Sequence, residues 1–136
     1  MTDLSTLLAR VEAGSGADRE LDAEIATTLG GFVREKRGRD QKSWLYHPTA
    51  PRRDGMWGAY FYTTDLNAVI ALVEARLPGA CWRIEKLSDA MKFGNRDLPD
   101  FWATCGLAGE QEQAYAPTPA RALLAALLRA EMEKQT

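Results

Sequence analysis

The chain has 136 residues, of which 46% are hydrophobic and 26% charged, and its formal net charge is −2. This length suits one domain that buries roughly two thirds of its unfolded surface, and the composition excludes disordered, collagenous and purely coiled-coil proteins. Because no apolar run approaches the roughly 18–20 residues of a membrane span, we expect one soluble, intracellular domain over residues 1–136, without a membrane partner. The near-neutral net charge argues against specific binding of duplex nucleic acid.

Two helices are predicted at the N-terminal end. The first runs up to Gly14, with Thr2 or Asp3 as its N-cap and Gly14 as a left-handed residue after its end. Its apolar stripe has the spacing i, i+3, i+4, i+7 and comprises Leu4, Leu7, Leu8 and Val11. The second helix begins after Asp18 and stops at two consecutive glycines. The joint between them is so short that the helices must be antiparallel or steeply crossed.

The next segment is less regular and contains a dense group of basic residues between positions 32 and 54. Strands are predicted at 43–46 and 57–62, because both segments are short, aromatic-rich and bounded by turn residues. Asp54 and Gly55 mark a turn just before the second strand. A hairpin with an irregular loop is one arrangement of this pair.

Two further helices have clear boundaries. One covers 63–77, with Asp65 as its N-cap and a Pro-Gly pair after its end. The last follows Thr118 as N-cap and Pro119 at the first helical position. Its leucines supply the inner face. Its polar face is expected to lie in water and comprises Arg121, Arg129, Glu131 and Glu133.

Three strands are predicted between these two helices. Residues 81–87 alternate between apolar and charged side chains, which indicates a half-buried strand. Shorter strands are predicted at 91–93 and 101–105, followed by a loop over 106–112. The element order is therefore α-α-β-β-α-β-β-β-α, and the predicted fold class is α/β of the α+β type, with helices closing the faces of the sheet.

Several segments together resemble the phage ABA-sandwich domain family of small phage and prophage proteins. The resemblance is carried, in this order along the chain, by residues 7–13 and 18–25, 62–69, 73–79 with 82–85, and 118–130. Each segment alone is a common helix or strand pattern, so the series is what is specific. The sequence departs from the family after the second helix, where Gly31 and Phe32 replace an expected tryptophan, and in the stretch 34–54.

The resemblance implies a three-layer α/β/α sandwich, in which one small, mostly antiparallel sheet is flanked by about four helices. It also implies a phage or prophage origin, and hence the host bacterial cytoplasm as the location. No catalytic motif comes with it.

The sequence contains none of the common catalytic motifs that we considered. The chain lacks a GxSxG elbow, a P-loop, an HExxH motif and a Rossmann glycine fingerprint. With one histidine, His47, and no CxxC spacing, neither a metal nor a cofactor is expected. Cys81 and Cys105 are expected to be buried, reduced thiols, with a single disulfide as the alternative. Asp97 and Asp100 could form a carboxylate pair for acid–base work, although turn-capping is the commoner role of such residues.

A basic and aromatic group is the strongest candidate site. Guanidinium groups bind phosphate oxygens bidentately and flat rings stack on bases, so this mixture suits a nucleotide-like anion. The alternative is a solvated loop beside aromatic core residues. The candidate ligand-binding residues are Arg34, Lys36, Arg37, Arg39, Lys42, Trp44, Tyr46, His47, Arg52, Arg53 and Trp57.

The sequence therefore favours a non-enzymatic phage protein that captures a small anionic ligand, such as a nucleotide-type host immune signal. A protein–protein or homo-oligomerising accessory module without a small ligand is the alternative. A hydrolase that uses Asp97, Asp100 or His47 is a third, weaker one.

Overall fold

The computed structural model describes residues 3–37, 42–46, 61–92, 94–95 and 97–134, with 34–37 and 42–46 described as backbone. The four helices within these ranges are α1 (Leu4–Ala13), α2 (Arg19–Thr28), α3 (Leu66–Arg76) and α4 (Pro119–Lys134). The strands are β1 (Val33–Arg37), β2 (Lys42–Tyr46), β3 (Cys81–Lys86), β4 (Phe101–Leu107) and β5 (Glu110–Ala116).

Each helix begins at the polar residue that the sequence predicts. The carboxylates of Asp3, Asp18 and Asp65 accept hydrogen bonds from backbone N–H groups in the first turns of α1, α2 and α3. The hydroxyl of Thr118 accepts one from the backbone N–H of Arg121 at 3.3 Å. These bonds satisfy donors that have no partner within the helix.

Gly14 follows α1 but is not left-handed, since its φ is −95°. The prediction of a left-handed cap is therefore wrong. A Cβ atom at this position would lie 2.7 Å from Nη1 of Arg121, so the glycine provides room for a neighbouring side chain rather than a special backbone conformation.

Strands β3, β4 and β5 form an antiparallel sheet in this order. The strands predicted at 81–87 and 101–105 are confirmed, but the loop predicted over 106–112 is wrong because β5 begins at Glu110. A two-residue turn containing Gly109, at φ 85°, joins β4 to β5. Of the strand predicted at 91–93, residues 91–92 form a turn and Phe93 lies outside the described residues.

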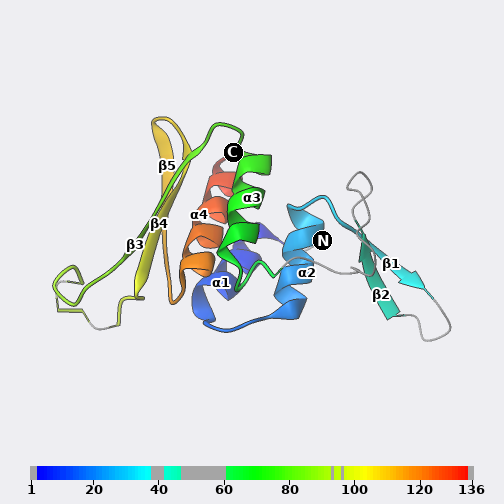
Figure 1. The fold of residues 1–136 in the computed structure, drawn as a ribbon, viewed down its shortest axis with the longest axis horizontal. Coiled ribbons are helices and arrows are strands. Elements are labelled where there is room, and N and C mark those ends of the chain that lie inside the picture. The colour runs from blue at the N-terminus through cyan, green and yellow to red at the C-terminus, as the bar shows by residue number, and fades with distance from the viewer. Residues whose placement is uncertain (1–2, 38–41, 47–60, 93, 96, 135–136) are drawn as a thin grey trace.

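Strands β1 and β2 form a separate two-stranded antiparallel ladder. The strand predicted at 43–46 is confirmed, but its partner is β1, which the sequence did not indicate. Of the strand predicted at 57–62, residues 57–60 lie outside the described ranges, and 61–62 lead into the turn before α3. In Figure 1 this hairpin lies beyond α2, on the side of the molecule away from the three-stranded sheet.

Helix α4 occupies the centre, packed against the sheet on one side and against α1 and α3 on the other. Figure 1 shows the described helices on one side of the three-stranded sheet. Four helices with this open antiparallel sheet confirm the predicted α+β class and are consistent with a sandwich. The polar face predicted for α4 is partly wrong, since Arg121 and Glu131 are buried. Both lie on a helix that is covered on two sides.

Candidate functional site

The hairpin β1–β2 brings together six of the eleven predicted ligand-binding residues. They are Arg34, Lys36 and Arg37 in β1 and Lys42, Trp44 and Tyr46 in β2. The other five, Arg39, His47, Arg52, Arg53 and Trp57, lie outside the described residues. The basic segment, for which a solvated loop was one expectation, therefore forms a regular antiparallel ladder over residues 33–37 and 42–46.

The register of this ladder places two cations directly opposite each other, Arg37 and Lys42. Glu35 stands opposite Trp44, and Val33 opposite Tyr46. Directly opposed residues of an antiparallel pair have Cβ atoms about 4.5–5.5 Å apart, and like charges at this spacing destabilise the pair. An anion bound at this end of the hairpin would remove that repulsion.

Charge is distributed unevenly between the hairpin and the rest of the chain. Residues 33–46 contain five basic and two acidic residues, a local excess of three positive charges. Since the whole chain has a net charge of −2, the remainder carries −5. The hairpin is therefore a cationic element on an acidic protein, which favours anionic partners at this element.

The residues on both sides of segment 33–62, which contains the hairpin, are hydrogen-bonded to α2. At its start, the backbone N–H groups of Gly30 and Phe32 donate to the carbonyl of Ala26 at 3.0 and 3.1 Å. At its end, the backbone N–H of Thr63 donates to the fully buried carboxylate of Asp22 at 2.8 Å. Helix α2 therefore accepts hydrogen bonds from the residues just before β1 and from Thr63, just before α3.

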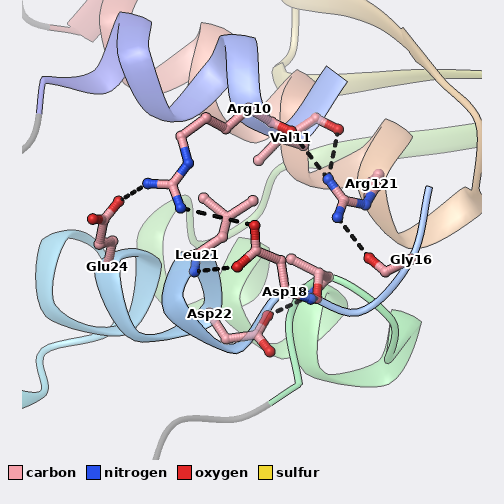
Figure 2. A network of polar contacts seen from close by, with 9 residues as sticks. Arg10, Val11, Gly16, Asp18, Leu21, Asp22, Glu24 and Arg121 are labelled. Carbon is pink, nitrogen blue, oxygen red and sulfur yellow. Dashed lines mark hydrogen bonds and ion pairs between the residues drawn. The ribbon is translucent and has the colours of Figure 1, made fainter. Parts of the chain in front are cut away.

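A polar network continues from α2 toward α1 and α4 (Figure 2). Arg10 of α1 forms ion pairs with Glu24 and, at 3.8 Å, with Asp18. Arg121 of α4 donates to the carbonyls of Arg10 and Val11 at 3.1 Å each and to that of Gly16 at 2.6 Å. These contacts hold α1, α2 and α4 together.

The sequence predicts no role for Asp22 and places Arg121 on a water-facing side of the last helix, although both side chains are buried. An acidic residue in the first turn of a helix is common, because the helix dipole favours a negative charge there. In the sequence Asp22 therefore looks like an ordinary helix residue. The close approach of Arg121 to Gly14 had only a short, glycine-rich joint as its sequence signal.

The predicted carboxylate pair does not form among the described contacts. Asp100 instead accepts a hydrogen bond from Nζ of Lys92 at 2.6 Å. This bond holds the pKa of the Asp100 carboxyl below its ordinary value. The backbone N–H of Asp97 donates to the side chain of Asn95 at 3.1 Å, which is a turn contact. The Asp100 carboxylate therefore forms an ion pair, and the turn contact at Asp97 uses the side chain of Asn95 rather than the predicted carboxylate.

The two cysteines are free and differ in surroundings. Cys105 is fully buried, and burial, assisted by the charge of Glu131, raises the pKa of its thiol to about 11. It is therefore protonated at neutral pH, which does not suit a nucleophile. Cys81 is exposed, so the expectation of two buried thiols is wrong for this residue. Because Cys81 stands opposite Gly106, it lies on the other face of the sheet from Cys105.

The described residues contain no group of three or more His, Cys, Asp or Glu side chains placed to hold a metal ion. None of the helices they form is both long enough and apolar enough to cross a membrane.

Comparison with known proteins gives one likeness in fold. No family model matches the chain, and no curated protein matches it. A phage protein from Bacillus cereus ATCC 14579, with a 2.0 Å crystal structure, has a similar fold, with a TM-score of 0.52 and 17% identity. The similarity covers 88% of this chain and 96% of that one. At this identity the comparison shows a shared fold and nothing further.

Proposed function

We propose that this chain is a phage- or prophage-encoded, non-enzymatic binding protein that captures a small anionic, nucleotide-type ligand at the hairpin β1–β2. The observation that carries the proposal is the ladder register, which sets Arg37 against Lys42. A free hairpin bears the cost of that repulsion, whereas a bound phosphate would be attracted by both cations.

The phage assignment is supported by the fold shared with the Bacillus cereus phage protein and by the series of segments that resemble the phage ABA-sandwich family. If it holds, the protein acts in the cytoplasm of the host bacterium. A phage gains from sequestering a nucleotide-type immune signal of its host, and sequestration needs affinity without turnover.

The composition of the hairpin supports a nucleotide rather than a bare phosphate. Trp44 and Tyr46 stand two and four residues after Lys42 in β2, so their register positions share a face of the ladder with the Arg37–Lys42 pair. Aromatic rings stack on bases at about 1–3 kcal/mol per base, while the cations bind phosphate oxygens. Both halves of a nucleotide therefore have matching residue types within ten strand residues.

Calorimetry against a panel of mono-, di- and cyclic nucleotides tests the proposal. At least one member is expected to bind, and the double substitution Arg37→Ala/Lys42→Ala is expected to weaken it by roughly tenfold to a hundredfold, as for the loss of charge-assisted hydrogen bonds. Lys134→Ala is the matched control, because it removes one cation from the C-terminal end of α4. The ligand is expected to be recovered unchanged after incubation.

Mass spectrometry of the denatured protein provides an independent test, since a captured ligand should co-purify. The proposal is wrong if no panel member releases heat and nothing co-purifies. It is also wrong if a bound nucleotide keeps its affinity after Arg37→Ala and Arg39→Ala.

A protein–protein or oligomerising module is the second candidate function. It is favoured by large apolar side chains that are exposed on the three-stranded sheet. Trp82 and Leu107 lie on the same face of this sheet, and Tyr115 lies on the other. Exposed apolar groups that share a face are typical of interaction surfaces.

A further inference from the structure

Strand β3 forms an edge of the three-stranded sheet, since among the described residues it is paired with β4 alone. An edge strand leaves backbone N–H and C=O groups available to another strand. Its side chains are also accessible, with Trp82 38% exposed and the side chain of Arg83 69% exposed. In Figure 1 the sheet lies at the end of the molecule opposite the hairpin β1–β2, so this edge is separate from the candidate anion site.

The residues of β3 are self-complementary about Ile84. On its two sides stand residues of opposite charge, Arg83 and Glu85, and beyond them Trp82 and Lys86. Two antiparallel copies of β3, related by a two-fold axis at Ile84, would set Arg83 opposite Glu85 of the second copy, and Glu85 opposite Arg83. Trp82 would stand opposite Lys86 of the second copy, where an ammonium group and an indole ring attract each other.

Other registers lose this complementarity. A symmetric antiparallel ladder pairs residues of the same face, so its centre can move only in steps of one residue along β3. Centring on Arg83 would set two arginines against each other, and centring on Glu85 would set two glutamates against each other. Like charges directly opposite each other are destabilising, so among the centres at Arg83, Ile84 and Glu85 the charges of this edge favour Ile84.

The two faces of the paired strands also match. Ile84 is partly buried and packs against the hydrophobic core, and it stands opposite Ala103 of β4. The two Ile84 side chains would therefore meet on the helix-covered face and extend the apolar layer across the axis. Arg83 already forms an ion pair with Glu85 of its own strand at 2.5 Å, so the four charges would alternate in sign on the opposite face.

We propose that the protein forms a two-fold symmetric homodimer in which the β3 strands pair edge to edge, centred on Ile84, and join two three-stranded sheets into one sheet of six strands. This interface is independent of the hairpin, so either proposal can fail without the other. The occupant of the edge is a second copy of this chain because the charge order of the strand is its own complement.

Sedimentation velocity over a wide concentration range tests the dimer. The unmodified protein is expected to show a concentration-dependent monomer–dimer equilibrium. Arg83→Glu is expected to weaken it at least tenfold, because two glutamates then face each other on each side of the axis. Adding Glu85→Arg reverses the pattern and is expected to restore association, which a merely misfolded single variant would not explain.

Cross-linking tests the register. In a Cys81→Ser background, Ile84→Cys places two thiols opposite each other at a Cβ separation compatible with a disulfide. Oxidised glutathione is expected to join the two copies, taking up the two electrons and two protons that the thiols release. Gln111→Cys on the exposed part of β5 is the control. The proposal is overturned if the protein stays monomeric at every concentration, if the double reversal fails to restore a dimer that Arg83→Glu weakens, or if Ile84→Cys cross-links no faster than the control.

Discussion

The buried ion pair between α3 and α4 allows a quantitative test of how this core tolerates charge. Glu131 is 2% exposed, and its carboxylate oxygens accept hydrogen bonds from Nε and Nη2 of Arg76 at 3.0 and 2.9 Å. Arg76→Gln removes the positive charge and leaves this carboxylate buried without its main partner. Breaking one half of a buried pair costs about 3–5 kcal/mol.

The expected cost here lies below that range. The side chain of Arg76 is 38% exposed, so solvent screens part of the interaction. Nζ of Lys134 also lies 3.7 Å from the same carboxylate and supplies some compensation. We therefore expect Arg76→Gln to lower the free energy of unfolding by about 2–3 kcal/mol at neutral pH, equivalent to roughly 10 °C in melting temperature.

The pH dependence distinguishes this mechanism from loss of packing. Burial pushes the pKa of Glu131 upward, but the hydrogen bonds and charge of Arg76 outweigh burial and hold the pKa below its ordinary value of 4.5. A carboxyl group with a lowered folded pKa stabilises the protein above its unfolded pKa and loses that effect as the pH falls through the folded pKa. Without Arg76, burial prevails and the folded pKa is raised. The difference in free energy of unfolding between the unmodified protein and Arg76→Gln is therefore expected to become smaller as the pH falls from about 7 to about 4.

Urea denaturation followed by circular dichroism at several pH values measures this difference. Arg129→Gln is the matched control on α4, because its ion pair with Glu12 is partly exposed at both ends and is expected to contribute less than about 1 kcal/mol. A loss below about 1 kcal/mol for Arg76→Gln at neutral pH, or a difference that stays constant on acidification, would refute the reasoning.

Two further predictions concern close packing and thiol reactivity. The Cβ of Gly14→Ala would lie 2.7 Å from Nη1 of Arg121. Because the guanidinium can move away only by giving up its hydrogen bonds to three carbonyls, we expect a cost of about 2–3 kcal/mol in urea denaturation. Gly16→Ala, with nothing within 4 Å, should change stability by less than about 1 kcal/mol, and equal losses for both would contradict this account. A thiol reagent is expected to label Cys81 at once and Cys105 only on unfolding, because Cys105 is fully buried with a pKa raised to about 11. Rapid labelling of native Cys81→Ser protein would show the burial to be wrong.

Sequence reasoning succeeded where local chemistry determines structure. The N-caps Asp18, Asp65 and Thr118 were predictable because each side chain bonds to a backbone group within three residues. Periodicity likewise placed the helices, since an apolar stripe needs only the spacing of neighbouring turns.

Strands that form mainly through cross-strand pairing, without a clear strand pattern of their own, were missed. Strand β5 presents Ala114 and Ala116 to the helices, and these small residues give little strand preference of their own. It forms because it pairs with β4 along its whole length. Strand β1, in which four of five residues are charged, was missed for the same reason, since its structure comes from pairing with β2. Residue types in the candidate site were therefore predictable, but their cross-strand register was not.

The position of α4 explains why its charged residues were misplaced. A helix with water on one side has a polar face, but α4 lies between the sheet and two other helices, so a charge on either side needs a partner from the neighbour it meets. Arg121 bonds to two of the carbonyls that α1 leaves free at its C-terminal end, where the helix dipole favours a cation. Glu131 is held by Arg76 of α3. Leucines and alanines would pack nearly as well after a shift of one turn, whereas each charge would then lose its partner. We infer that these two buried charges set how α1 and α3 dock on α4.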